Sequence, residues 1–174
     1  MKTIFAEGNP QSIEQVLNNK DHRNYLQHQL VTEFPEDTVV TVKLNIPGPI
    51  KNNQYIAKLF KTGEQEFITN FKVLKKVDLN SDAGPETLFV VSMPADQVKQ
   101  KAIAFEDEFN YRRLFDIDVL NSKHGHYSRV ESGYSPRKCL ICNQNAKECA
   151  RSRQHSVAEL QDKISKMYDE EIDD

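Results

Sequence analysis

Residues 113–120 of this chain read Arg-Leu-Phe-Asp-Ile-Asp-Val-Leu, so that apolar and acidic side chains alternate one by one. Strict alternation with a period of two predicts a half-buried β-strand over 114–120, because successive side chains of a strand point to opposite faces. Asp116 and Asp118 would then project side by side from one face. Two neighbouring carboxylates favour a hard cation such as Mg²⁺, which takes oxygen ligands and often also holds substrate phosphates. The alternative interpretation is a solvated strand face with two acids that have no special role.

The composition limits what such a strand can belong to. A chain of 174 residues with 38% hydrophobic residues suits one domain with a modest core, which we expect to span 1–174. The net charge of -3 argues against general nucleic-acid binding, and no apolar run approaches the ~18 residues of a membrane span. The first residues turn polar too soon for a signal peptide, and three cysteines, an odd number, favour a reducing compartment. We therefore expect a cytoplasmic protein that binds neither nucleic acid nor membrane.

The order of the periodic segments predicts an α+β fold. Between residues 38 and 120 the expected order is β-α-β-β-α-β, the ferredoxin-like arrangement in which an antiparallel sheet carries both helices on one face. The expected strands are 38–45, 72–79, 87–93 and 114–120, with a hairpin partner at 126–130, and the expected helices are 54–71 and 94–108. Gly63 indicates either a close helix–sheet contact or a break in its helix. Many nucleotidyl-transfer domains share this plan and carry metal-binding aspartates on the exposed sheet face, an analogy of fold that favours a function for the two aspartates.

Two segments flank this core and divide the single domain into three parts. The parts are N-terminal helices (1–35), the α+β nucleotidyltransferase core (38–130), and a helical, cysteine-containing C-terminal segment (131–174). The first part is predicted to form a short helix capped by Ser12, an interruption at residues 18–19, and a second helix that starts near Asp21 and turns Tyr25 inward.

Two cationic side chains stand where free backbone amides could help to bind anions. Lys51 ends the stretch Pro-Gly-Pro-Ile-Lys, a tight turn between an expected strand and a helix capped by Asn53. Arg23 lies in the first turn of the second expected helix. Each is a candidate phosphate contact, and the alternative for each is an ordinary solvated side chain.

All three cysteines lie in a short C-terminal segment, spaced as Cys139-x₂-Cys142-x₆-Cys149-x₅-His155. A Cys₃His set can close a tetrahedral structural Zn²⁺ site, and the first pair has the spacing of a zinc knuckle. The second interval is short for the common zinc modules, so the alternative is three small reduced thiols that pack a helical segment. The segment is also basic, which suggests a face for phosphates or for an acidic partner. Its cationic residues are Arg137, Lys138, Lys147, Arg151 and Arg153.

Taken in order along the chain, these motifs resemble holo-citrate lyase synthase, also called apo-citrate lyase phosphoribosyl-dephospho-CoA transferase. The resemblance is carried by Pro-Gly-Pro-Ile-Lys at 47–51, Gly-Pro-Glu at 84–86, Arg-Leu-Phe-Asp-Ile-Asp-Val at 113–119, Ser-Arg at 128–129, and the cysteine segment from Pro136 to His155. A lone Asp-x-Asp is a weak signal, but this ordered series over most of the chain is specific. The family pattern has glycine where Arg112 stands here, a change that removes a close backbone approach to ligand or replaces it with a second guanidinium.

The resemblance implies a nucleotidyltransferase. It would move a prosthetic group from 2'-(5''-triphosphoribosyl)-3'-dephospho-CoA to a serine of the apo acyl-carrier (gamma) subunit of citrate lyase, with release of pyrophosphate. In that chemistry Asp116 and Asp118 would hold Mg²⁺ against the triphosphate. The residues with implied catalytic roles are Asp116, Asp118 and Arg113, and those with implied phosphate contacts are Lys51, Arg23 and Arg137.

Two other functions stay open at this point. One is the same reaction on the carrier protein of malonate decarboxylase, although the cysteine segment brings the resemblance closer to the citrate lyase branch. The other is a non-catalytic zinc-knuckle adaptor that binds an acidic partner, for which the two aspartates would be dispensable.

Overall fold

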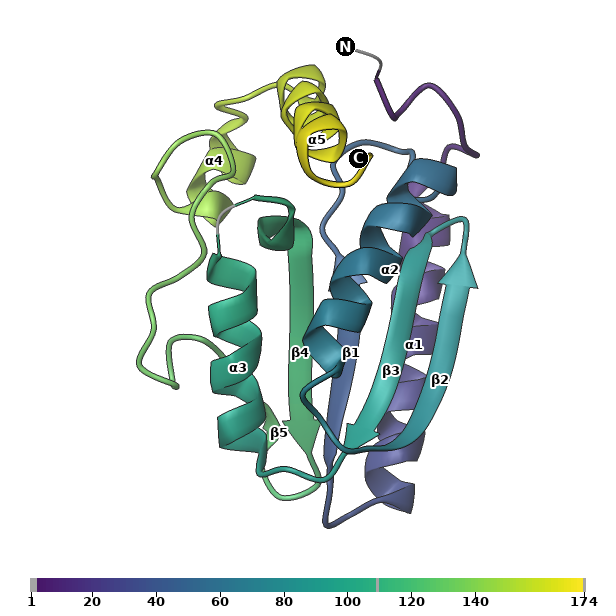
Figure 1. The fold of residues 1–174 in the computed structure, drawn as a ribbon, viewed down its shortest axis with the longest axis vertical. Helices are drawn as coiled ribbons and strands as arrows, with labels where there is room; N and C mark the ends of the chain where they lie inside the picture. The colour runs from purple at the N-terminus through teal and green to yellow at the C-terminus, as the bar shows by residue number, and fades with distance from the viewer. Residues whose placement is uncertain (1–2, 109, 174) are drawn as a thin grey trace.

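A five-stranded antiparallel sheet forms the middle of the computed structural model, which describes residues 3–108 and 110–173 (Figure 1). The elements are α1 (Ile13–Glu33), β1 (Thr38–Leu44), α2 (Gln54–Ile68), β2 (Val73–Ser81), β3 (Gly84–Val91), α3 (Ala95–Asp107), the 3-10 helix η1 (Tyr111–Leu114), β4 (Phe115–Asn121), β5 (Gly125–His126), α4 (Ala146–Ser152) and α5 (Val157–Glu171). The strands lie in the order β2-β3-β1-β4-β5, and all neighbours pair antiparallel. The α+β class and the order β-α-β-β-α-β from β1 to β4 are therefore confirmed, with element ends shifted by a few residues.

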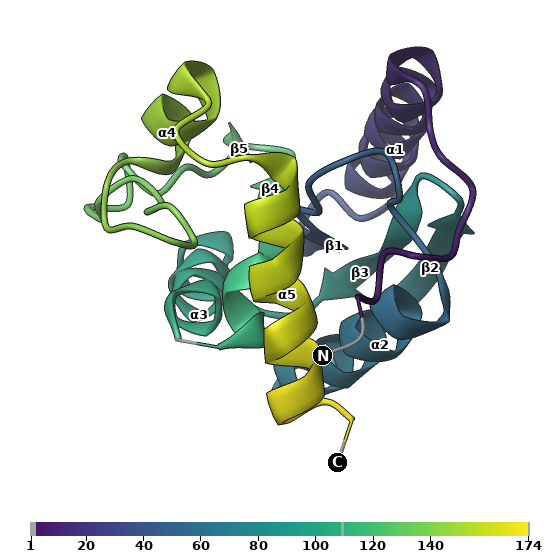
Figure 2. The same cartoon turned by 90° about the horizontal axis from the view of Figure 1, so that it is seen from above.

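The sheet separates two apolar layers. Helices α2 and α3 cover one face, and α5 lies over the end of the sheet where β4 begins, next to η1 (Figures 1 and 2). Their core joins Val42 of β1 and Phe115 of β4 to aromatic and aliphatic side chains of the three helices. Helix α1 covers the opposite face (Figure 2). The smaller core on that face consists of Leu30, Val39, Leu88, Val90 and Leu120.

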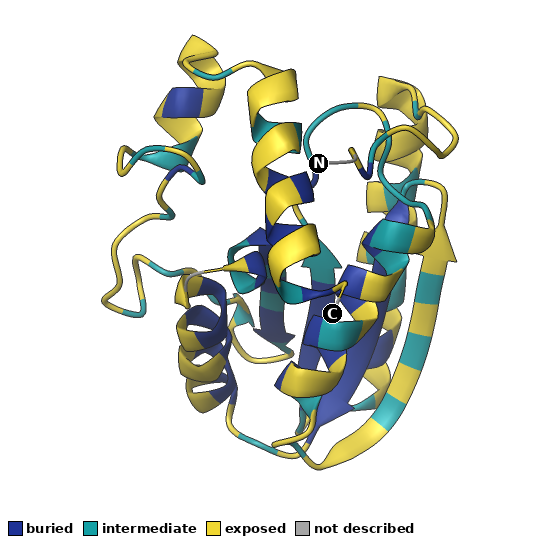
Figure 3. Cartoon of the chain, turned by 45° about the horizontal axis from the view of Figure 1, so that its top comes forward, coloured by how far each residue is buried: buried dark blue, intermediate teal, exposed yellow. Residues whose placement is uncertain are grey.

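Strand β4 alternates as its sequence predicts. Phe115, Ile117 and Val119 are at most 1% exposed and face the larger core. Asp116 and Asp118 are half-buried and emerge on the side of α1. Exposed positions are frequent on the edge strand β2, on the first half of α1 and on the C-terminal segment (Figure 3). Because α1 alone among the described helices covers the side on which the aspartates emerge, whereas α2 and α3 cover the other, the two acids leave the sheet on its less covered face.

The N-terminal part differs from the prediction, because residues 13–33 form one continuous helix rather than two. The predicted capping box is present, since Ser12 Oγ accepts from the Gln15 N–H while Gln15 Oε1 accepts from the Ser12 N–H. The expected interruption at 18–19 is wrong, because packing on the sheet outweighs the weak helix propensity of two asparagines. Tyr25, expected inside, is 58% exposed, whereas Leu30, also expected inside, is buried against the sheet.

Helices α2, α4 and α5 begin where the sequence supplies a side-chain cap, whereas α3 follows Pro94 without one. Asn53 Oδ1 accepts hydrogen bonds of 3.0 Å from the amides of Tyr55 and Ile56 at the start of α2. Asn145 and Ser156 cap α4 and α5 in the same way. None of the helices in the described part of the chain has the length and apolar character needed to cross a bilayer.

Gly63 marks a close contact between α2 and β4, which is one of the two interpretations of this glycine. A Cβ atom at residue 63 would lie 2.2 Å from Phe115 Cζ. The ring of Phe115 has no room to move, because Phe60 stacks on it at 6.0 Å and Phe105 meets it edge-on at 5.4 Å between ring centroids. This contact fixes the residue that directly precedes the first aspartate.

Overpacking a core usually costs about 1–3 kcal/mol, and a Cβ 2.2 Å from an immobile ring places this site at the upper end of that range. Because alanine adds roughly 1 kcal/mol of helix propensity, we expect Gly63→Ala to lower the free energy of unfolding by about 1–2 kcal/mol in total. The measurement is urea unfolding followed by circular dichroism. Lys61→Ala, exposed on the same helix, is the matched control and should change stability by ~0.5 kcal/mol at most. A Gly63→Ala protein as stable as the control would contradict the tight contact.

Candidate active site

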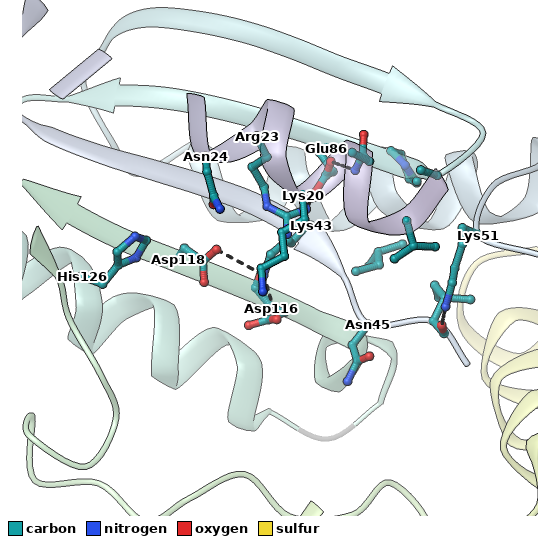
Figure 4. A pocket seen from close by; sticks show the side chains of 17 residues that line it. Lys20, Arg23, Asn24, Lys43, Asn45, Lys51, Glu86, Asp116, Asp118 and His126 are labelled. Carbon is teal, nitrogen blue, oxygen red and sulfur yellow. Dashed lines mark hydrogen bonds and ion pairs between the residues drawn. The ribbon is translucent and has the colours of Figure 1, made fainter. Parts of the chain in front are cut away.

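The two carboxylates of β4 are bridged by a lysine from the neighbouring strand (Figure 4). In the register of β1 and β4, Lys43 stands opposite Asp116 and Thr41 opposite Asp118. Lys43 Nζ lies 2.7 Å from Asp116 Oδ2 and 3.3 Å from Asp118 Oδ2. The predicted pair of acids therefore exists on one face, with an ammonium group between them.

The surroundings of Asp116 keep its carboxylate ionised. Burial alone would raise the pKa of Asp116, but the charge and hydrogen bond of Lys43, together with the charges of Arg137 and Lys99, hold that pKa below its usual value. The side chain is still 45% exposed. Asp116 is thus charged at neutral pH and accessible to a ligand.

The bridged aspartates lie in a cavity of about 580 Å³ beside α1, which we call the aspartate cavity. Its walls come from the first half of α1, the end of β1 with the turn that follows, the β2–β3 hairpin, β4 and β5 (Figure 4). The cationic residues that line it are Lys20, Arg23, Lys43 and Lys51, and the acidic ones are Glu86, Asp116 and Asp118. A carboxylate pair among ammonium and guanidinium groups suits a polyanionic ligand together with a cation.

Helix α1 supplies part of the cationic wall. The side of the helix that packs on the sheet in its second half lines the aspartate cavity in its first half. Leu30 on this side is buried, whereas two and three turns earlier the same side carries Arg23 and Asn19. Both bind Glu86 of β3: Arg23 forms an ion pair with one carboxylate oxygen, and Asn19 Nδ2 donates to the other at 2.8 Å. Glu86 is 4% exposed, so this contact orients the Arg23 guanidinium within the cavity wall.

Lys51 lies on another wall of the aspartate cavity, at the end of the proline-rich turn (Figure 4). Its Nζ donates a hydrogen bond of 2.6 Å to the carbonyl of Ile46, which holds the side chain along the turn. Burial lowers the pKa of Lys51. The sequence predicts four cationic side chains for the site. Two of them, Arg23 and Lys51, thus lie in the same cavity as the aspartates.

The other two, Arg113 and Arg137, line a second cavity of about 440 Å³. Arg113 Nη2 donates to the carbonyl of Cys139 at 2.8 Å, so η1 turns this side chain toward the cysteine segment. Arg137 Nη1 donates to the carbonyl of Phe115 at 2.8 Å and lies 3.7 Å from Asp116 Oδ1. Arg137, distant in sequence, therefore reaches the aspartate pair, while the adjacent Arg113 points elsewhere.

Glu106 of α3 is a buried acid that the sequence pattern did not reveal as part of the site. Its Oε2 accepts from the backbone N–H of Ile117 at 2.6 Å, and its Oε1 accepts from Arg129 Nη2 at 2.7 Å. Burial raises the pKa of Glu106, although Arg137, the Ile117 amide and Arg129 act in the opposite direction. Because Ile117 lies between the two aspartates, Glu106 fixes the backbone that carries them. Its position one turn after Ala102 on an apolar helix stripe was the available signal.

Arg112 does not provide a second guanidinium for the aspartate cavity. It lies 2.7 Å from carboxylate oxygens of Glu66 and Glu108, and its guanidinium stands 4.6 Å from the centroid of the Phe105 ring. Glu66 belongs to α2, Phe105 belongs to α3, and Glu108 directly follows α3, so all three partners lie on the face opposite α1. Within the described residues, positive φ outside glycine occurs at Asn110 and Arg153 and not at Arg112, so its backbone does not require glycine.

The cysteine segment brings its four predicted ligands together. Cys139, Cys142, Cys149 and His155 each offer a ligand atom within 4.8 Å of the other three. The cysteines are free thiols, and the 3.4 Å between Cys142 Sγ and Cys149 Sγ is too long for a disulfide bond. This cluster, which we call the Cys₃His cluster, has the donor set for a metal ion.

Comparison with known proteins places this geometry in a family. The family model described as apo-citrate lyase phosphoribosyl-dephospho-CoA transferase matches residues 11–171. The chain belongs to this family. The matched part of this transferase family member includes both cavities and the Cys₃His cluster.

Individual relatives agree with the family match. A probable apo-citrate lyase phosphoribosyl-dephospho-CoA transferase from Streptococcus pyogenes serotype M3 is 35% identical over 172 residues, which cover 95% of this chain and 90% of that protein. The transferase of that name from Escherichia coli O1:K1 / APEC is 29% identical over 171 residues, 95% of this chain and 93% of that protein. Protein CitXG of Leuconostoc mesenteroides subsp. cremoris is 36% identical over 168 residues, 94% of this chain but 36% of that longer protein.

For this transferase family member we expect Lys43→Met to raise the pKa of Asp116, because the largest opposing charge is removed while burial remains. The measurement is a carbon NMR titration of the side-chain carboxyl groups. In the wild type a lowered pKa contributes stability that is present above the unfolded value, about 3.9, and is lost as the pH falls through the folded value. In the Lys43→Met protein, the free energy of unfolding should therefore fall less as the pH is lowered through this range.

Lys75→Met is the matched control, since Lys75 is also a strand lysine paired with a carboxylate, but its partner is Glu33 at the end of α1, outside the aspartate cavity. It should leave the pKa of Asp116 unchanged. An Asp116 pKa that is the same in the Lys43→Met and control proteins would show that Lys43 does not control the charge of the pair.

Proposed function

We propose that this protein attaches the 2'-(5''-triphosphoribosyl)-3'-dephospho-CoA prosthetic group to a serine of the apo acyl-carrier (gamma) subunit of citrate lyase. The observation that supports this most is the aspartate cavity, where a carboxylate pair lies among four cationic side chains. A triphosphate donor carries several negative charges, and such a cavity can neutralise and orient them. The family to which the chain belongs is named for the same transfer.

In this reaction the serine hydroxyl oxygen attacks the α-phosphorus of the donor, the bond to the bridging oxygen of the β-phosphate breaks, and pyrophosphate leaves. Such a displacement needs alignment and charge neutralisation more than a protein nucleophile. The hydroxyl proton passes to an aspartate of the pair.

Asp116 and Asp118 are the residues proposed to hold Mg²⁺. Lys43 engages the Oδ2 atom of each carboxylate, and Arg137 lies 3.7 Å from Asp116 Oδ1. The Oδ1 atoms are thus the oxygens that Lys43 leaves for the ion. Carboxylate oxygens are the protein ligands that Mg²⁺ prefers, and the half-exposed pair fits the ion without a change of fold. When bound, Mg²⁺ supplies charge neutralisation at the donor phosphates.

The cations take separate roles in this proposal. Arg23, oriented by Glu86, and Lys51, held along its turn, bind oxygens of the triphosphate from two walls. Arg137 acts beside Asp116, where its charge reaches the phosphorus under attack. Arg113 serves chiefly to position the segment that carries Arg137, because its guanidinium is committed to a carbonyl of that segment.

The carrier protein is proposed to dock on the basic C-terminal segment. Lys138, Lys147, Arg151 and Arg153 are all exposed there. Their side chains can attract an acidic partner and bring its serine past Arg137 toward Asp116. The free thiols of the segment also support a reducing, cytoplasmic location, since thiols persist in such compartments.

The test is incubation of the protein with apo acyl-carrier subunit, triphosphoribosyl-dephospho-CoA and Mg²⁺, followed by intact-mass spectrometry of the carrier. The wild type should add one prosthetic group to the carrier and release pyrophosphate. Asp116→Asn and Asp118→Asn should each slow the transfer by roughly 100-fold or more, because charge stabilisation is lost where it develops in the transition state.

Asp78→Asn is the matched control, an exposed carboxylate on the edge strand β2 that lies outside the aspartate cavity. It should transfer at the wild-type rate, and all variants should keep the wild-type circular dichroism. The carrier protein of malonate decarboxylase is assayed in parallel. A mass gain on that carrier and not on the citrate lyase carrier would show that the proposed acceptor is wrong. A folded protein that modifies neither carrier would contradict the proposed function.

A further inference from the structure

We propose that Cys139, Cys142, Cys149 and His155 form a structural Zn²⁺ site. Their ligand atoms all lie within 4.8 Å of one another. Tetrahedral Zn²⁺ with Zn–S bonds of about 2.3 Å places its sulfurs about 3.8 Å apart, so only small shifts would close the cluster on the ion. Three sulfurs and one imidazole nitrogen complete four-coordination and leave no open position, which is typical of a structural site rather than a catalytic one.

His155 is oriented as a ligand. Its Nε2 atom is buried and has no hydrogen-bond partner, while its Nδ1 atom faces a carboxylate oxygen of Glu159 at 3.6 Å. A buried polar atom without a partner is unfavourable, and a metal ion supplies the missing interaction. A carboxylate on the other ring nitrogen is the usual partner of a zinc-bound histidine, because it fixes the tautomer and the ring.

The segment around the cluster buries few apolar side chains. From residue 134 to residue 156, Cys139 and Cys149 are the buried residues, Leu140 packs half-buried against the larger core, and Tyr134 and Ile141 are each 40% exposed. The alternative from the sequence, three thiols that pack an apolar helical segment, needs a core that these residues do not form. Small segments without such a core are usually closed by a metal ion or a disulfide.

The local backbone returns the last ligand to the first. Lys138 and Asn145 form an antiparallel bridge, and the Ile141 N–H points at Cys139 Sγ at 3.4 Å. Arg153 ends α4 in the left-handed conformation, with φ 52°, which side chains other than glycine rarely adopt. This turn brings His155 back over the thiols, so an unfavourable backbone conformation is kept where it completes the ligand set.

The Zn²⁺ site would also hold the segment that carries Arg137. The carbonyl of Arg137, two residues before the first ligand, accepts at 2.9 Å from the N–H of Ala146, which lies within the loop that the cluster closes. On the other side, Arg137 Nη2 donates at 2.6 Å to the carbonyl of Arg113, which lies in η1 just before β4. The ion thus lies outside both cavities but braces the arginine that reaches Asp116. The site itself is independent of the proposed reaction.

The direct test is the metal content of the full chain, purified with reductant, equilibrated with Zn²⁺ and desalted. Inductively coupled plasma mass spectrometry should find one zinc per chain, and a mercurial thiol reagent should release it. Co²⁺ in place of Zn²⁺ should give the strong visible absorption of tetrahedral cobalt with thiolate ligands. A folded, reduced protein that retains no zinc, or that retains iron instead, would overturn the assignment.

Variants locate the ion. Cys149→Ser and His155→Gln should weaken Zn²⁺ binding in competition with a chromophoric chelator by more than the 10–100-fold expected for Glu159→Gln, which removes the partner of the histidine. His28→Gln, exposed on α1, is the matched control and should bind as the wild type does. Chelation of the wild type should speed amide exchange in 137–155 and leave β1 protected. Equal zinc affinity in the ligand and control variants would contradict the site, as would unchanged exchange after the metal is removed.

Discussion

The arrangement of the site depends on the ion pairs that Lys43 forms with Asp116 and Asp118. Two carboxylates one residue apart on a strand face repel each other, and partial burial strengthens that repulsion. The ammonium of Lys43 offsets it because β1 and β4 pair with Lys43 opposite Asp116. A slip of one residue would turn Lys43 into the larger core, so the buried apolar residues of β1 fix the register and the charges together.

The two layers around the sheet give this charge cluster its rigidity and its access. On the face covered by α2 and α3, Phe115 is held in place by Gly63 and neighbouring rings. Glu106 accepts a hydrogen bond there from the amide of Ile117, which lies between the aspartates. On the face covered by α1, the side of this helix that points to the sheet carries apolar Leu30 in its second half and charged Arg23 in its first half. The first half of α1 therefore borders a cavity instead of a core. A polar stripe on one helix therefore opens the space in which the strand presents its acids.

Much of the inner architecture could be predicted from the sequence because it rests on local patterns. Alternation predicted β4 and placed Asp116 and Asp118 on one face, and side-chain caps marked the starts of α1 and α2. Spacing alone brought attention to the cysteines and His155, which the fold brings together. Each of these signals lies within a few residues of the feature that it predicts.

The parts that escaped prediction depend on contacts between distant segments. The continuity of α1 and its place over the aspartates come from packing on the sheet, which no propensity of residues 18–19 reveals. Lys43 alternates with Thr41 on β1, but its partner follows only from the register with β4. Arg113 looked close to the aspartates in sequence, yet the 3-10 helix turns it away and the cysteine segment supplies Arg137.

The most direct measurement is a crystal structure of the protein with triphosphoribosyl-dephospho-CoA and Mn²⁺ in place of Mg²⁺, since Mn²⁺ is located by its anomalous scattering. We predict an anomalous peak at coordination distance from carboxylate oxygens of both Asp116 and Asp118, with the triphosphate between Arg23 and Lys51. An ion and triphosphate bound elsewhere, with Asp116 and Asp118 contacting neither of them, would contradict the assignment of this cavity as the active site.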